Sequence, residues 1–267
     1  MRADVGVYWQ LAKAGFRRQS HYRLAMVAGL ITNVVFGFVR AAVLMAAVHA
    51  NGNFGGYDRG TIGAYTWLSQ GLLGALAFWT PPDLVERIRT GDVAIDFLRP
   101  IDMQFAHLAE YLGRAVCTLL PRGVPSLLIG AFTFGLAFPT TPGTYVLGGI
   151  SLVLAMALSF LSMFVVCLAG FWLIETRGLR GLHQICGTFL AGLFVPVHLF
   201  PQWLRDIAYA TPFPAMLQWP IDVLSGRTAG FAAVEIVAVQ CLWVLLLVGA
   251  GQLMLRAGRR KLEVQGG

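Results

Sequence analysis

The residues that could carry out chemistry in this chain are few, and their spacing does not build an active site. Four cysteines all lie in apolar runs without a CxxC pair, and no metal-ligand spacing links His49, His107, His183 and His198. A phosphate-binding Gly-x-x-x-x-Gly-Lys-Ser/Thr loop does not occur, and Lys13 and Lys261 lie outside any glycine-rich turn. We therefore expect no catalytic residue, no metal and no cofactor bound by this chain.

Long uncharged segments dominate the chain instead. The 52 residues between Arg122 and Glu175 contain no charged side chain, and only the Pro- and Gly-containing stretch 138–143 interrupts them. One helix of that length would measure about 78 Å, against a bilayer core of about 30 Å. Hydrophobic residues make up 57% of the chain and charged residues 12%, which excludes an ordinary soluble domain. The function must therefore be one that needs a membrane.

Apolar length and flanking charge predict an all-α membrane protein, with a single transmembrane domain over residues 1–267. Basic residues cluster at 2–23, 87–99, 177–180 and 256–261, at alternate ends of the apolar segments. This placement indicates a multi-pass protein of the plasma (inner) membrane with both termini in the cytoplasm, and argues against nucleic-acid binding. The six expected spans are 24–48, 62–79, 117–138, 145–174, 182–200 and 231–255.

Residues 1–23 predict an amphipathic helix that lies on the inner leaflet. Apolar residues recur at three- and four-residue steps, while Lys13 and Arg17 face the other way. Aromatic side chains suit the membrane interface and the cations suit anionic lipid headgroups. A disordered basic tail is the alternative. The apolar stripe consists of Val5, Tyr8, Trp9, Ala12 and Phe16.

A few charged residues lie within or beside the apolar segments. A charge near the bilayer centre costs about 2.5–3.5 kcal/mol, so Arg40 should face a cavity or a partner, or else extend to the outer headgroups. Glu235 could pair with Arg40 or be solvated at the interface, and Arg122 could line an interface between two copies. Glu110 and Arg114, four residues apart, predict an ion pair.

The loop at 80–100 follows the second expected span and predicts a short helix over 82–90. Thr80 can cap this helix, Pro81 and Pro82 suit its first turn, and Gly91 is a natural stop. A helix this short is marginal alone in water, so packing against a partner should stabilise it. Its mixed charge suits a soluble protein surface.

The segment 194–224 cannot form one helix, because five prolines interrupt it. Its aromatic residues suit the membrane interface. We expect short helices that dip back from the outside and form an outer gate, with an ordinary structured loop as the alternative. Irregular backbone at membrane depth would then have to be covered by protein or water. The expected gate residues include Phe194, Phe200 and Trp203.

Two motifs resemble those of type-2 ATP-binding-cassette exporter permeases. Glu86, Gly91 and Leu98-Arg99-Pro100 resemble the coupling-helix signature of that family. The stretch that begins Phe194-Val-Pro196 and continues through Phe200-Pro201 to Trp203 is similar to the outward re-entrant helices of these permeases. The resemblance covers essentially the whole chain, and the small six-span variants that work with a separately encoded ATPase fit its length best.

The resemblance implies a permease subunit that is not itself an enzyme. A cytoplasmic ATP-binding-cassette ATPase would bind ATP and Mg, and a second copy or a paralogous permease would complete a pathway surrounded by membrane lipids. The exported substrate would be a hydrophobic or amphiphilic molecule, such as a drug, a secondary metabolite or a lipid-like compound. A membrane-embedded lipid-modifying enzyme and an ion-coupled secondary transporter are the alternatives. The implied ATPase-coupling residues are Glu86, Arg87, Arg89, Gly91 and Arg99, and the candidate pathway or gate residues are Arg40, Arg122, Phe194, Phe200, Trp203 and Glu235.

Overall fold

The computed structural model describes residues 5–51, 55–78, 83–134, 139, 141–173 and 175–265. The described residues form helices and turns without a β-strand, which confirms the all-α prediction. The α-helices are α1 (Val5–Ser20), α2 (Arg23–Asn51), α3 (Arg59–Leu73), α4 (Leu84–Thr90), α5 (Val93–Leu98), α6 (Met103–Phe134), α7 (Pro142–Leu168), α8 (Arg177–Leu190), α9 (Gln202–Tyr209), α10 (Gln218–Leu224) and α11 (Phe231–Gln265). The 3-10 helices are η1 (Ala169–Phe171), η2 (Val197–Leu199) and η3 (Pro214–Met216).

Four helical segments among the described residues are long and apolar enough to cross a membrane. The expected spans 62–79 and 182–200 instead contain α3 and α8, which have 15 and 14 residues. At 1.5 Å per residue these helices measure about 22 and 21 Å, less than the hydrocarbon core of about 30 Å. The expected span ends at 79 and 138 lie outside the described residues. The four long segments are Arg23–Ala50, Met103–Phe134, Pro142–Phe171 and Phe231–Lys261.

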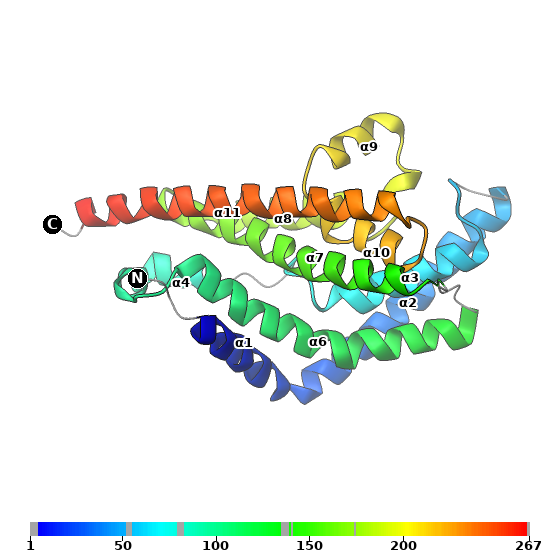
Figure 1. Cartoon of the computed structure of the whole chain (residues 1–267), viewed down its shortest axis with the longest axis horizontal. Helices are drawn as coiled ribbons and strands as arrows, with labels where there is room; N and C mark the ends of the chain where they lie inside the picture. The colour runs from blue at the N-terminus through cyan, green and yellow to red at the C-terminus, as the bar shows by residue number, and fades with distance from the viewer. Residues whose placement is uncertain are drawn as a thin grey trace.

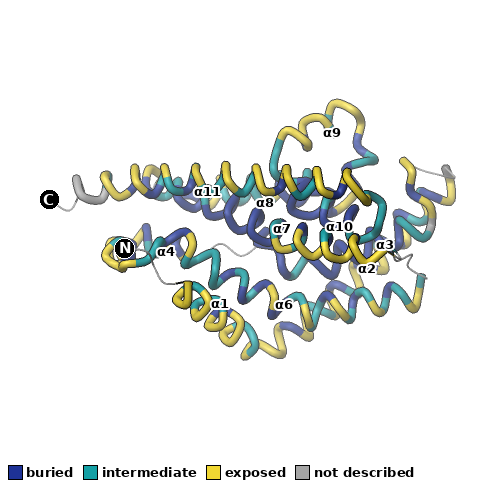
Figure 2. Tube along the Cα trace, in the orientation of Figure 1, coloured by how far each residue is buried: buried dark blue, intermediate teal, exposed yellow. Residues whose placement is uncertain are grey.

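The central helix of the bundle is α7, which packs against α6, α8, α10 and α11 (Figure 1). Two thirds (67%) of its most apolar stretch is buried within the chain, compared with 11% for α11. The remaining apolar faces lie open along the long helices (Figure 2). Such continuous apolar surface is rare on a soluble monomer, so these faces are suited to contact lipid or another membrane-embedded chain.

The chain leaves α3 after Leu73 and continues as buried turns through 74–78. Side chains of other helices satisfy this irregular backbone: the Tyr111 hydroxyl donates to the Ala75 carbonyl (2.6 Å), and the Ala77 N–H donates to Ser159 Oγ (3.2 Å). Non-helical backbone at this depth is tolerated because protein groups supply its hydrogen bonds. An apolar composition therefore did not mean a continuous helix over 62–79.

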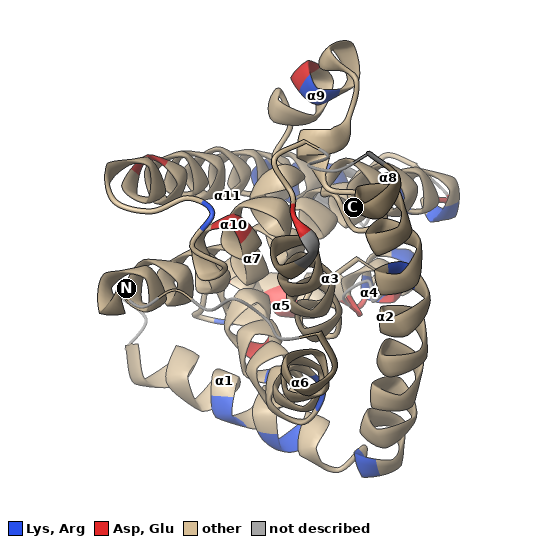
Figure 3. Ribbon diagram, turned by 90° about the vertical axis from the view of Figure 1, so that its right-hand side faces the viewer, with Lys and Arg blue, Asp and Glu red and all other residues tan. Residues whose placement is uncertain are grey.

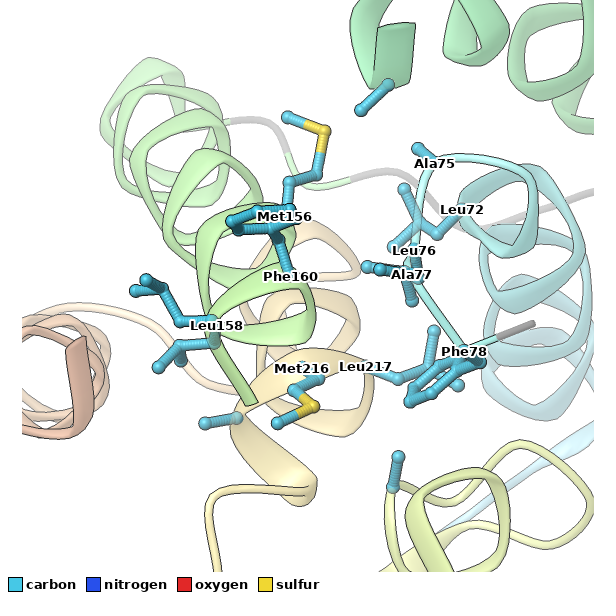
Figure 4. Close-up of a cluster of buried hydrophobic side chains, with 14 of the residues drawn as sticks. Leu72, Ala75, Leu76, Ala77, Phe78, Met156, Leu158, Phe160, Met216 and Leu217 are labelled. Carbon is cyan, nitrogen blue, oxygen red and sulfur yellow. The ribbon is translucent and has the colours of Figure 1, made fainter. Parts of the chain in front are cut away.

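These turns join the hydrophobic core shown in Figure 4. Their side chains face α7 and the η3 turn, which ties the exit of α3 to the most buried helix. The labelled core residues are Leu72, Ala75, Leu76, Ala77, Phe78, Met156, Leu158, Phe160, Met216 and Leu217.

The amino-terminal helix α1 is fixed on α6 by two close backbone approaches. A Cβ atom on Gly113 would lie 1.9 Å from the Ala12 carbonyl oxygen, and one on Gly15 would lie 2.1 Å from the Glu110 carbonyl oxygen. The helix Val5–Ser20 agrees with the helix predicted within 1–23 rather than with a disordered tail, and its position on the inner leaflet stays a prediction. The basic residues of α1 lie along its outer edge (Figure 3).

The expected ion pair between Glu110 and Arg114 is not the one that the structure contains. Glu110 Oε1 instead lies 3.4 Å from Arg18 Nη1 of α1, while the Arg114 guanidinium lies 5.9 Å from the centre of the Tyr111 ring. The helical spacing of Glu110 and Arg114 allowed a local pair, but the docking of α1 offered a partner from far along the chain.

Candidate functional site

The clearest candidate site is the segment formed by α4 and α5, at the same end of the molecule as the C-terminal turns of α11 (Figure 1). Helix α4 ends at Gly91, whose φ of 84° lies in the left-handed region that favours glycine. The predicted short helix with a glycine stop is therefore confirmed, while its expected cap at 80–82 lies outside the described residues. Leu84 and Ile88 are buried on the side of α4 that meets α7 and η1.

A two-bond ion pair closes α4 onto α5. Arg87 Nε and Nη2 donate to Asp96 Oδ2 (2.6 Å) and Oδ1 (2.9 Å), and the Asp96 side chain is only 8% exposed. The hydrogen bond with Asp96 raises the pKa of Arg87 above its ordinary value. Arg99 lies farther from the same carboxylate, with 3.6 Å between Nη1 and Oδ1. The sequence analysis missed both α5 and the role of Asp96, although an acid nine residues after an arginine across a glycine turn was a usable signal.

Glu86 and Arg89 form the exposed side of α4. They pair with each other at 2.7 Å, and this contact raises the pKa of Arg89. The structure thus brings Glu86, Arg87, Arg89 and Gly91 together on one short helix, with Arg99 just beyond α5. A cavity of about 480 Å³ lies between this segment, α1 and α6, and its lining includes Glu86, Arg87 and Arg99.

Arg40 turns inward from α2 towards α3. Its Nη1 donates to Ser69 Oγ at 2.9 Å, and its Nε and Nη2 are buried without a hydrogen-bond partner among the described residues. The ion pairs among the described residues do not include one between Arg40 and Glu235, which is exposed on α11. Of the two expected placements, the side chain takes the one that faces protein.

Arg122 joins α6 to α2 inside the chain. Its Nη2 donates to the Ala25 carbonyl at 2.9 Å, and its guanidinium lies over Gly29, where a Cβ atom would come within 2.0 Å of the guanidinium carbon. Pro121 and Pro125 lie within α6 on either side of it, and proline inside a helix favours a bend. Helix α6 is bent rather than straight (Figure 1). The contacts of Arg122 in the described residues are thus between neighbouring helices of one chain.

The segment 194–224 consists of the short helices η2, α9, η3 and α10, which confirms the prediction of a broken segment. Helix α9 stands away from the long helices (Figure 1). Of the three expected gate residues, Phe200 is buried and stacks on Phe189 with ring centres 5.2 Å apart, whereas Phe194 and Trp203 are exposed.

A buried polar network that the sequence analysis missed holds this segment together. Asp222, whose side chain is 3% exposed, accepts from Gln218 Nε2 (2.9 Å) and lies 2.8 Å from His198 Nε2. Gln218 Oε1 also accepts the Val197 N–H at 2.9 Å, and its Nε2 lies 3.3 Å from the Tyr57 hydroxyl. The spacing of Gln218 and Asp222, four residues apart, was visible in the sequence, but the partners on η2 and before α3 were not.

Comparison with known proteins places these features in a family. The sequence model of the ABC-2 family transporter proteins matches residues 34–266, which include the α4–α5 segment and the broken segment 194–224. A search of curated protein sequences finds no match to this chain. The family model covers far more than half of the chain, and the apolar helices agree with a membrane-embedded transport subunit. The chain therefore belongs to the ABC-2 family of transporter proteins.

Proposed function

We propose that this permease exports its substrate with energy from ATP that a separate cytoplasmic ATP-binding-cassette subunit hydrolyses. That subunit would hold ATP and Mg and would contact the exposed Glu86 and Arg89 of α4. The observation that carries the proposal is the construction of α4, with a polar face open to a partner and an apolar face packed on the centre of the bundle.

This construction suits the transmission of force. Leu84 is fully buried and Ile88 nearly so, so a displacement of α4 would be passed to α7 and η1. The Arg87–Asp96 pair would carry α5 along with α4 as one body. Closure of a nucleotide-bound partner against this surface would thereby tilt α7, the most buried helix. The pathway would then open in turn to the inside and to the outside of the membrane.

The proposed topology puts the α4–α5 segment and both termini in the cytoplasm, with the protein in the plasma (inner) membrane. Its support is the enrichment of basic residues at this end of the molecule. Six crossings would result if the buried turns at 74–78 complete α3 and the segment after Leu190 completes α8. The short helices of 194–224 would then dip back from the outside and form the outer gate.

A second copy or a paralogous permease would complete the pathway, together with surrounding lipids. Helix α8 supports this because it exposes Leu182, Ile185 and Phe189 along one side, which leaves an apolar face for another membrane-embedded surface. The mostly uncharged interior favours a hydrophobic or amphiphilic substrate.

Replacement of Gly91 by alanine tests the coupling role of α4. The left-handed backbone at Gly91 disfavours any residue with a Cβ by about 1–2 kcal/mol, although the space around it is open. The matched control is Gly149→Ala in α7, where a Cβ atom also meets nothing within 4 Å and the backbone is helical.

Both variants, and Glu86→Ala, would be reconstituted with the ATPase partner in proteoliposomes. We expect Gly91→Ala and Glu86→Ala to lower transport and the substrate stimulation of ATP hydrolysis, and Gly149→Ala to leave both near wild type. Wild-type transport and stimulation in both α4 variants would refute the proposal.

A further inference from the structure

A second cavity lies beside the C-terminal part of α11. Its volume is about 270 Å³, and it lies between α5, the start of α6 and the C-terminal part of α11. Arg99, Arg256 and Arg259 contribute the cationic part of its lining, while Met103 and Leu255 are buried apolar residues at its base. The cavity therefore combines several guanidinium groups with an apolar floor.

The carboxylates of this cavity are already engaged by other groups. Asp96 is bound by Arg87 through two hydrogen bonds, and Arg99 reaches it only at 3.6 Å. Asp102 accepts from Gln252 Nε2 at 2.8 Å and from the Phe105 N–H at 3.0 Å. The lining holds three arginines against two aspartates, so positive charge is in excess by one, and a site of this kind favours an anion.

An exposed apolar strip leads to the same place along α11. Leu242, Leu246, Gly249 and Leu253 are exposed and follow one another at four- and three-residue steps, and the next step reaches Arg256. A ligand that fits this surface has an anionic head for the arginines and an apolar tail for the strip. Guanidinium groups suit phosphate oxygens because they donate several hydrogen bonds in a fixed planar arrangement.

We propose that this cavity binds the phosphate headgroup of an anionic phospholipid from the inner leaflet, with the acyl chains along the strip on α11. Basic pockets between membrane helices at the cytoplasmic surface are suited to such headgroups. The bound lipid would bridge α5 to α11 next to the α4 surface. This inference rests on the proposed cytoplasmic location of the α4–α5 segment, but not on the presence of an ATPase partner.

Native mass spectrometry of the detergent-purified full chain tests the site. Phosphatidylglycerol and phosphatidylcholine would be titrated against the wild type and against Arg256→Gln/Arg259→Gln. The control Arg177→Gln/Arg260→Gln removes two exposed arginines from α8 and α11, outside the cavity lining.

We expect the wild type to bind phosphatidylglycerol at least about tenfold more tightly than phosphatidylcholine. The cavity variant, Arg256→Gln/Arg259→Gln, should lose about 30-fold in affinity for phosphatidylglycerol, since each arginine near the surface contributes about 1 kcal/mol. The control should lose less than about twofold. Equal affinity of the wild type for the two lipids would overturn the proposal whether or not the variants fold, as would equal losses in the cavity variant and the control. Displacement of the lipid by inorganic phosphate at similar concentrations would assign the site to a soluble anion and would overturn the lipid assignment.

Discussion

Replacement of Asp96 by asparagine should release α5 from α4. The substitution keeps the side-chain shape but removes the charge that holds Arg87 at 2.6 and 2.9 Å. Hydrogen bonds to charged groups contribute about 1.5–3 kcal/mol each, and the 32% exposure of the Arg87 side chain calls for a value near the lower end. A loss of about 2 kcal/mol would reduce the closed-to-open equilibrium constant of the segment about 30-fold.

Amide hydrogen exchange over residues 84–98 in the purified protein measures this change directly. We expect exchange in α5 to speed up about 30-fold in Asp96→Asn. Asp92→Asn is the matched control, because it removes the same charge from the same α4–α5 segment, but the Asp92 side chain accepts at 2.9 Å from Thr90 Oγ1 and does not bind Arg87. Wild-type exchange in Asp96→Asn, or equal acceleration in both variants, would refute the assignment of the ion pair as the lock of this segment.

Three further predictions concern the rest of the fold and use thermal unfolding of the purified protein. Gly113→Ala should destabilise the docking of α1 by about 1–3 kcal/mol, because the new Cβ would lie 1.9 Å from a carbonyl oxygen. Gly149→Ala should have little effect, because the space around Gly149 is open. Equal melting temperatures of the two variants would contradict this prediction. Asp58→Ala should lower the stability by about 1 kcal/mol because it removes the capping box with Thr61. The hydrogen bond from the Thr61 N–H lowers the pKa of Asp58, so this stabilisation should be present at neutral pH and lost as pH falls below about 4. A stability difference between wild type and Asp58→Ala that stays constant down to pH 2 would contradict this prediction. Asp222→Asn should lower the melting temperature and increase proteolysis within 194–224, since it weakens a buried contact to His198; unchanged proteolysis would show that the network does not hold the segment.

The sequence predicted the local features of the fold well. Uncharged runs located the four long apolar helices, Gly91 marked the end of α4, and the prolines of 194–224 indicated short helices. Each of these features depends on residues close together in the chain, so a window of sequence contains the physical cause. Hydropathy measures apolar content and not helix continuity, so it did not indicate that the helices within 62–79 and 182–200 would be as short as α3 and α8. The crossing of the membrane by these two stretches stays a prediction.

The contacts of the candidate site were harder to predict because they join distant segments. Arg40 meets Ser69 across two helices, and Arg122 lies over Gly29 because that residue has no side chain to exclude it. His198 and Asp222 come together only after the intervening short helices fold. Such pairs follow from the packing of the bundle, which a single sequence does not specify through periodicity or charge.

Site-specific photo-crosslinking in the native membrane tests the central claim most directly. A photoreactive amino acid would replace Arg89 on the exposed side of α4 or, in a second variant, Trp203 on α9, and mass spectrometry would identify the captured chains. The account predicts that position 89 captures a subunit with an ATP-binding-cassette sequence and that position 203 does not. Capture of that subunit from position 203 and not from position 89, in a protein that still transports, would contradict it.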